Sequence, residues 1–157
     1  MDKPDSKTKI AVCSRSFSKN DVLREELLSR YSNVKFNDDG LALEGDSLVS
    51  FLSGFDKAIT ALEVLDEKTL AQLPELKVIG KYGVGLDMLD FSAMRKFNIR
   101  LGWTGGVNKR SVSELVLSFS ILMLRLVPIA NRGAIAGNWK QHVGSLLTEK
   151  TVGIIGC

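Results

Sequence analysis

Short apolar segments alternate with helical segments of about ten residues through the first part of the chain, and this alternation constrains the fold most. Five apolar segments predict strands over residues 9–13, 33–36, 57–60, 76–80 and 99–103. Strands joined by helices can pair in parallel, because a helix provides the crossover that parallel neighbours require. The sequence therefore predicts an α/β protein with a doubly wound parallel sheet and right-handed crossovers.

Helices are expected between these strands, over residues 21–30, 45–52, 67–73 and 91–97. Asp66 and Asp90 stand where an aspartate can cap the third and fourth helices. Pro74 is expected to end the third, since the residue before a proline avoids helical geometry.

The chain changes character at Asn108, where one long apolar helix is predicted to run to about Val127. Pro128 suits the first position of a following helix, and Gly137 suits the residue just past its end. A helix that is apolar on nearly every face must be covered on nearly every face. A membrane span is disfavoured because Glu114 and Arg125 lie within the apolar stretch.

Composition excludes several classes of protein. The chain has 157 residues, 45% hydrophobic and 25% charged, with a formal charge of +3, which is typical of a globular protein without a nucleic-acid-binding face. Cys13 and Cys157 show no paired spacing, and no signal segment opens the chain. We therefore expect a cytoplasmic protein that binds neither nucleic acid nor membrane.

Several motifs occur in a fixed order from residue 76 onward. Residues 76–90 read Leu-Lys-Val-Ile-Gly-Lys-Tyr-Gly-Val-Gly-Leu-Asp-Met-Leu-Asp, and are followed by Asn-Ile-Arg at 98–100, Thr-Gly-Gly-Val-Asn at 104–108, Ser-Val-Ser-Glu-Leu at 111–115, Ala-Gly-Asn-Trp at 136–139 and Lys-Thr-Val-Gly-Ile-Ile-Gly at 150–156. In order and spacing this series resembles the D-isomer-specific 2-hydroxyacid dehydrogenase family, and within it most resembles phosphoglycerate dehydrogenase.

The resemblance implies three regions in this chain. Residues 1–107 would form a flavodoxin-like substrate domain, and residues 108–150 the interdomain and dimerisation helices. Residues 151–157 would be the first strand of an NAD-binding Rossmann domain, whose remainder is expected in sequence beyond Cys157.

The resemblance also implies an activity. The full-length protein would transfer a hydride between NAD and a D-2-hydroxy acid such as 3-phosphoglycerate, in serine biosynthesis, as a homodimer. NADP is a possible substitute for NAD, and glyoxylate and hydroxypyruvate reductases share the same motifs. The 157-residue chain alone is expected to be inactive and to contain no catalytic residue and no metal site.

Four positions match substrate-binding residues of the family, namely Gly83, Val84, Gly85 and Asn108. The glycine-rich loop at 83–85 would hold the substrate carboxylate through successive backbone N–H groups, an arrangement that suits anions, and Val84 would also lie near the cofactor. Gly156 would be the first glycine of Gly-x-Gly-x-x-Gly, the turn that binds a dinucleotide pyrophosphate. The alternatives are a tight turn at 83–85 and a helix cap at Asn108.

Three positions depart from the family or suggest other roles. Gly105 replaces a proline, so the turn before Asn108 is expected to be looser. Residues 60–62 are Thr-Ala-Leu where some relatives have a basic residue for a substrate phosphate, and Lys81 nearby is expected to be a solvated flank of the strand. His142 is interpreted as structural, and Glu114 as a residue favoured by the start of its helix.

Two other functions are weighed. A non-catalytic, dinucleotide-sensing corepressor-like scaffold has the same fold and could share these motifs. A phospho-receiver of similar topology would need an acidic pair after the first strand and an aspartate after the third, whereas the chain has Ser-Arg-Ser at 14–16 and Ala-Leu-Glu at 61–63.

Overall fold

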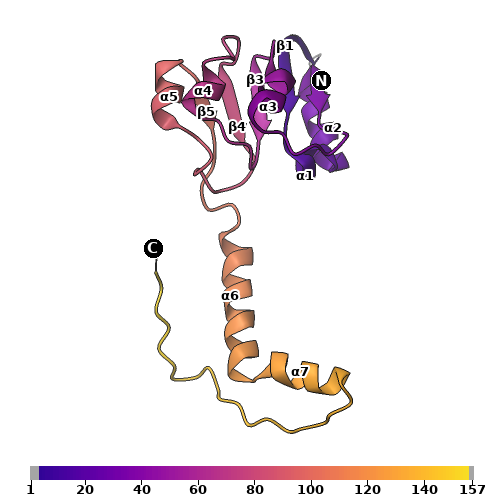
Figure 1. The fold of residues 1–157 in the computed structure, drawn as a ribbon, viewed down its shortest axis with the longest axis vertical. Helices are drawn as coiled ribbons and strands as arrows, with labels where there is room; N and C mark the ends of the chain where they lie inside the picture. The colour runs from indigo at the N-terminus through magenta and orange to yellow at the C-terminus, as the bar shows by residue number, and fades with distance from the viewer. Residues whose placement is uncertain (1–3, 156–157) are drawn as a thin grey trace. The chain divides into compact units, whose positions relative to one another are not determined.

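A computed structural model describes residues 4–155 of the chain (Figure 1). The chain divides into two compact units, Met1–Gly105 and Gly106–Cys157. The division falls close to the boundary expected at residue 107. Each unit is described by itself below.

The first unit is built on a five-stranded parallel sheet in the order β2-β1-β3-β4-β5. Its strands are β1 (Asp5–Val12), β2 (Tyr31–Phe36), β3 (Lys57–Thr60), β4 (Val78–Lys81) and β5 (Arg100–Gly102). This order is that of flavodoxin-like doubly wound folds, and it confirms the predicted fold class. β1 starts earlier than predicted, because Asp5 pairs with Tyr31 across an irregularity that precedes Lys9.

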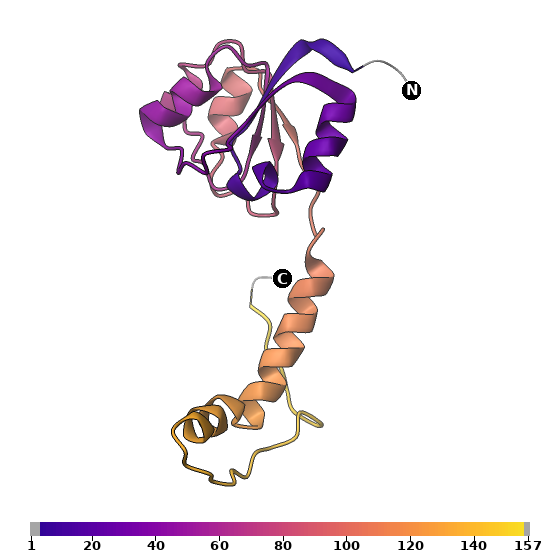
Figure 2. The same ribbon diagram turned by 90° about the vertical axis from the view of Figure 1, so that its right-hand side faces the viewer.

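Helices cover both faces of the sheet. They are α1 (Arg15–Ser18), α2 (Asp21–Arg30), α3 (Gly45–Leu52), α4 (Glu67–Leu70) and α5 (Phe91–Lys96). Figures 1 and 2 show α2 on one face, with α3, α4 and α5 on the other. This distribution follows from right-handed crossovers, because the path from β1 to β2 runs across the sheet in the opposite direction to the later ones.

Local capping explains most helix boundaries. Asp90 accepts hydrogen bonds from the backbone N–H groups of Ser92 and Ala93 at the start of α5, both at 2.9 Å. The Asp66 carboxylate accepts from the Thr69 N–H at 2.8 Å and begins α4. α4 is shorter than predicted because the chain leaves α-helical geometry through i→i+3 bonds ahead of Pro74, including Leu73 N–H to Leu70 O at 3.1 Å.

The main core lies between the sheet and the three helices α3, α4 and α5. One row of paired residues crosses four strands, with Ala11 beside Ala58, Ala58 beside Ile79, and Ile79 beside Leu101. Leucines of α3 and α4 pack on this surface, and Leu48, Leu52 and Leu70 are essentially inaccessible to solvent. This packing fixes the strand ends relative to one another, since densely packed interiors deform little.

The second unit contains two helices, α6 (Lys109–Leu124) and α7 (Val127–Ile135). α6 ends before the predicted Val127, because Leu126 takes a left-handed conformation with φ of 55°. Gly137 follows α7 with φ of 76°, as predicted for a residue just past a helix end. Both helices leave large apolar side chains exposed, including Met123 at 68% and Ile135 at 80%.

The structure assigns no strand to residues 151–155, so the strand expected at the start of the NAD-binding domain stays a prediction for the full-length protein. A strand is stable only when its N–H and C=O groups pair with a neighbour, and no neighbouring strand is available in the described part of the second unit. Within residues 4–155, no single helix is long and apolar enough to span a membrane. α6 and α7 taken together are long and apolar enough for a membrane span, but the pair is bent by 66°.

Candidate functional site

The loop at Gly83–Gly85 directly follows β4 at the carboxyl edge of the sheet, where open α/β sheets usually bind ligands. Within residues 4–155, none of the backbone N–H groups of Gly83, Val84 and Gly85 donates to a protein acceptor. Gly83 and Gly85 are exposed and Val84 is half-buried. The loop therefore presents successive free donors, which suits an anion such as a carboxylate.

The two glycines of this loop have different conformations. Gly83 has φ of 125°, a region that L side chains rarely adopt. Gly85 has no positive φ, and a Cβ built there would meet only the Asp87 carboxylate, at 3.6 Å. The protein itself therefore leaves room for a Cβ at Gly85, and a requirement for glycine at this position would have to come from a ligand.

A cavity of about 210 Å³ lies against the loop. Val84 and Met88 are half-buried in its wall. Its walls come from the end of β4 and from the segments that follow β3 and β4. The lining residues are Ala61, Leu62, Lys81, Tyr82, Gly83, Val84, Gly85, Asp87 and Met88. The three loop residues predicted to bind substrate thus line one cavity together.

Lys81 connects the two segments that form this cavity. Its ammonium group donates to the backbone carbonyl of Ala61 and is partly buried, and the N–H of Tyr82 donates to Thr60 O at 2.7 Å. The interpretation of Lys81 as a solvated flank is therefore wrong: the side chain links the end of β4 to the end of β3.

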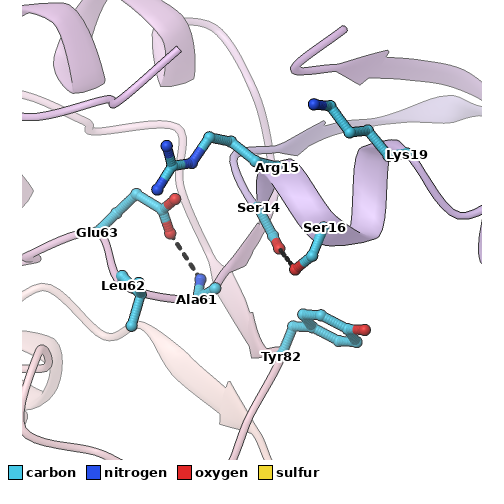
Figure 3. Close-up of a pocket in the computed structure, with 8 residues that line it drawn as sticks. All are labelled: Ser14, Arg15, Ser16, Lys19, Ala61, Leu62, Glu63 and Tyr82. Carbon is cyan, nitrogen blue, oxygen red and sulfur yellow. Dashed lines mark hydrogen bonds between the residues drawn. The ribbon is translucent and has the colours of Figure 1, made fainter. Parts of the chain in front are cut away.

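A larger cavity of about 590 Å³ opens at the ends of β1, β3 and β4 (Figure 3). The sequence analysis did not identify it. It is lined by Ser14, Arg15, Ser16, Lys19, Ala61, Leu62, Glu63 and Tyr82. The available signal was the Ser-Arg-Ser sequence directly after β1, since polar residues after a parallel strand lie at the ligand-binding edge.

Asn108 is the N-cap residue of α6, but its side chain makes no capping hydrogen bond. Its backbone carbonyl accepts from the Ser111 hydroxyl at 2.9 Å. The cap interpretation is confirmed for position only, and the side-chain amide is exposed in the second unit. Because Asn108 and the 83–85 loop belong to different units, their joint role in one site stays a prediction.

The glycine at position 105 has a local explanation. A Cβ at Gly105 would lie 2.9 Å from a ring carbon of Trp103, closer than such contacts occur in proteins. The indole ring therefore occupies the space that a proline ring would need. Glycine at position 105, where the family has proline, therefore leaves room for the ring of Trp103.

The remaining sequence candidates do not gather into a site. Gly156 lies outside the described residues. Glu114 forms an i,i+4 ion pair with Arg110 at 2.9 Å on the surface of α6, and His142 is half-buried in a segment without regular structure. Residues 4–155 contain no cluster of three or more His, Cys, Asp or Glu side chains able to hold a metal ion.

Cys13 is the buried thiol at the end of β1. Its N–H donates to Ile59 O at 2.8 Å, which joins the ends of β1 and β3. Burial raises the pKa of the thiol strongly, and the Glu63 carboxylate adds to the rise. Cys13 is therefore protonated at neutral pH and suited to packing, since the thiolate is the reactive form.

Comparisons with known proteins identify the family. Residues 10–156 match the sequence model of the D-isomer specific 2-hydroxyacid dehydrogenase catalytic domain. A glyoxylate/hydroxypyruvate reductase of Arabidopsis thaliana, HPR3, is 29% identical over 142 residues, which cover 84% of this chain and 43% of the relative. A D-3-phosphoglycerate dehydrogenase of Archaeoglobus fulgidus is 32% identical over 94 residues, covering 59% of this chain and 18% of that protein.

A solved structure supports the same fold. The crystal structure of a D-isomer specific, NAD-binding 2-hydroxyacid dehydrogenase from Polaromonas sp. JS6 66 superposes with a TM-score of 0.74 at 23% identity, covering 90% of this chain and 43% of that one. The chain thus spans less than half the length of these relatives. On the match over residues 10–156, the chain belongs to the D-isomer specific 2-hydroxyacid dehydrogenase family.

Proposed function

We propose that this chain forms the substrate-binding part of an oxidoreductase that exchanges a hydride between NAD and a D-2-hydroxy acid. The observation that carries the proposal is the set of free N–H groups at Gly83, Val84 and Gly85, three residues that line one cavity at the carboxyl edge of the sheet. A 2-hydroxy acid presents a carboxylate, and two or three backbone donors can hold one without a charged side chain. Asn108 would add a side-chain amide donor.

The substrate is proposed to be a short D-2-hydroxy acid of the 3-phosphoglycerate type, or its 2-keto form. One relative is named for 3-phosphoglycerate and another for glyoxylate and hydroxypyruvate. The first of these substrates carries a charged group at the end away from its carboxylate, and the other two do not. Residues 60–62 provide no basic side chain here, so any charge recognition must come from elsewhere in the site.

The described residues do not form a dinucleotide site by themselves. Such a site needs a strand, a glycine-rich turn and a helix N-terminus, and residues 151–155 form no strand. Because the relatives are much longer than this chain, the dinucleotide-binding residues are proposed to lie in sequence after residue 157, with Gly156 opening the turn. Bound there, NAD would supply the hydride acceptor, and Val84 would contribute an apolar contact to it.

The full-length protein is proposed to be a cytoplasmic homodimer. Large apolar side chains of α6 and α7 are exposed, among them Leu117, Phe119, Met123 and Ile135, and exposed apolar patches of this kind usually mark an interface. A second subunit would cover this surface. The buried free thiol of Cys13 fits a reducing compartment.

The direct test is to assay the full-length protein with a panel of D-2-hydroxy acids and NAD or NADP, following the nicotinamide absorbance at 340 nm. Turnover with D acids and none with the matched L acids supports the proposal. Nicotinamide binding without turnover of any acid would contradict it and favour the corepressor-like scaffold. NADP-dependent turnover would correct the cofactor alone.

A further inference from the structure

The two cavities at the carboxyl edge of the first unit adjoin each other. Ala61, Leu62 and Tyr82 contribute to the walls of both the cavity of about 210 Å³ and the cavity of about 590 Å³. A ligand whose carboxylate is held by the 83–85 loop therefore has room to extend past Tyr82 into the larger cavity.

The walls of the larger cavity carry an excess of positive charge. Arg15 and Lys19 are cationic and Glu63 is the one acid among the lining residues, so two positive charges face one negative charge. No ion pair within residues 4–155 includes Arg15 or Lys19. The Glu63 carboxylate accepts a hydrogen bond from Ala61 N–H at 2.6 Å, which engages one of its oxygens at the wall.

The side chain of Arg15 is carried on a well-anchored segment. Ser14 begins α1 by accepting from the N–H of Phe17 at 3.3 Å, and the Phe17 ring packs edge-to-face on Tyr82 with centroids 5.4 Å apart. Figure 3 shows the Arg15 side chain extending from α1 toward Glu63, with Tyr82 on the opposite wall. The contact between Phe17 and Tyr82 thus holds α1, which carries Arg15, against the end of β4.

The geometry points to a subsite for a second anionic group of the substrate, with Arg15 as its main recognition residue and Lys19 at its rim. This inference rests on the proposed function and names the substrate class: a D-2-hydroxy acid whose far end carries a phosphate or a carboxylate. A guanidinium group can bind either oxyanion through two parallel hydrogen bonds. The hydroxyls of Ser14 and Ser16 lie in the same wall and are hydrogen-bonded to each other at 3.3 Å, so one of them keeps an O–H donor for the ligand.

The test compares three acids on the full-length protein: D-3-phosphoglycerate, D-malate and D-glycerate, whose far ends are a phosphate, a carboxylate and a neutral hydroxyl. Arg15→Gln is expected to lower kcat/KM for whichever of the two acids with a charged far end is preferred by about tenfold to a hundredfold more than for D-glycerate, mainly through KM. Lys19→Gln should act in the same direction with a smaller effect. Glu63→Gln should raise the preference for that acid over D-glycerate a few-fold, because it removes a like charge while its amide oxygen can still accept from Ala61 N–H.

Arg95→Gln is the matched control, since this exposed arginine on α5 lines neither cavity. Its selectivity should equal that of the unaltered protein. If Arg15→Gln lowers kcat/KM equally for the acids with a charged far end and for D-glycerate, or for neither, the subsite is overturned. Turnover of D-glycerate would then still support the proposed function. Failure to turn over any acid would overturn both. The relative kcat/KM for D-3-phosphoglycerate and D-malate separates phosphate from carboxylate as the bound group.

Discussion

The Lys81 ammonium group donates to the backbone carbonyl of Ala61 and joins the ends of β4 and β3. Both residues line the cavity beside the glycine loop. The contact therefore holds together the two segments between which we place the substrate.

Replacing Lys81 with methionine should loosen this junction. Methionine keeps the aliphatic stem and removes the donor, so the free energy of unfolding should fall by about 1 to 2 kcal/mol, the usual worth of a charged hydrogen bond that is partly exposed. Urea unfolding followed by circular dichroism measures the change. Lys77→Met, at an exposed side chain just before the start of β4, is the control and should change stability little. Equal stability of the two variants would contradict the structural role of Lys81.

The Thr60 hydroxyl is buried without a hydrogen-bond partner in the described part of the chain. Thr60→Val removes an unpaired polar atom at nearly constant volume, so it should raise the free energy of unfolding by up to about 1 kcal/mol.

Ser18 supplies a contrasting control for Thr60. Its buried hydroxyl donates to Val12 O at 3.4 Å and accepts from Asn37 N–H at 3.0 Å. Ser18→Ala should therefore destabilise by about 1 kcal/mol, because both hydrogen bonds of the hydroxyl are lost while the Asn37 N–H keeps its bond to Val12 O at 3.1 Å. Thermal unfolding of both variants checks the opposite signs, and destabilisation by Thr60→Val would show that its hydroxyl is satisfied.

Asp66 should give the protein part of its acid sensitivity. Hydrogen bonds from the Thr69 side chain and then from its backbone N–H hold the pKa of Asp66 below its ordinary value of 3.8. A carboxyl group whose pKa is lower in the folded state stabilises the fold above its unfolded pKa, and this contribution is lost as pH falls through the folded pKa.

Asn is also a good N-cap residue but does not titrate. The stability advantage of the unaltered protein over Asp66→Asn should therefore shrink as pH is lowered below about 3.8. Urea midpoints of both proteins at pH 7 and near pH 3 measure this difference. A constant difference between the two pH values would contradict the assignment.

Gly83 should require glycine for backbone reasons alone. Gly83→Ala places a side chain at φ of 125°, with nothing within 4 Å of the new Cβ, so the cost is conformational strain of about 1 to 3 kcal/mol rather than a clash. The melting temperature should fall without any ligand present. An unchanged melting temperature would indicate that the loop relaxes to an ordinary conformation.

The sequence predicted the first unit well, since its signals are local. α2 and α3 have the predicted bounds, residues 21–30 and 45–52. The spacing of their apolar residues and the polar residues that flank them all lie within a short stretch of sequence. α1 was missed, since a four-residue helix held by a Ser14 cap has no periodicity to detect.

Non-local features were not predictable in the same way. The larger cavity depends on β1 lying next to β3, which brings Arg15 near Glu63 and Tyr82, and that adjacency is a property of strand order. The apolar pattern at residues 151–155 is typical of a buried strand, but a pattern cannot supply the neighbouring strand that it needs. The loop at Gly83–Gly85 was predictable because its position follows from β4 alone.

Kinetics and stability of Gly85→Val in the full-length protein show most directly whether the 83–85 loop binds the substrate carboxylate. The structure leaves room for a side chain at Gly85 and gives it no positive φ, so the melting temperature should stay near that of the unaltered protein. If the 83–85 loop holds the substrate carboxylate, kcat/KM for the best D-2-hydroxy acid should fall by about tenfold to a few hundredfold for each hydrogen bond lost. A lowered melting temperature with normal kinetics in the folded fraction would contradict the account and remove the loop from the active site.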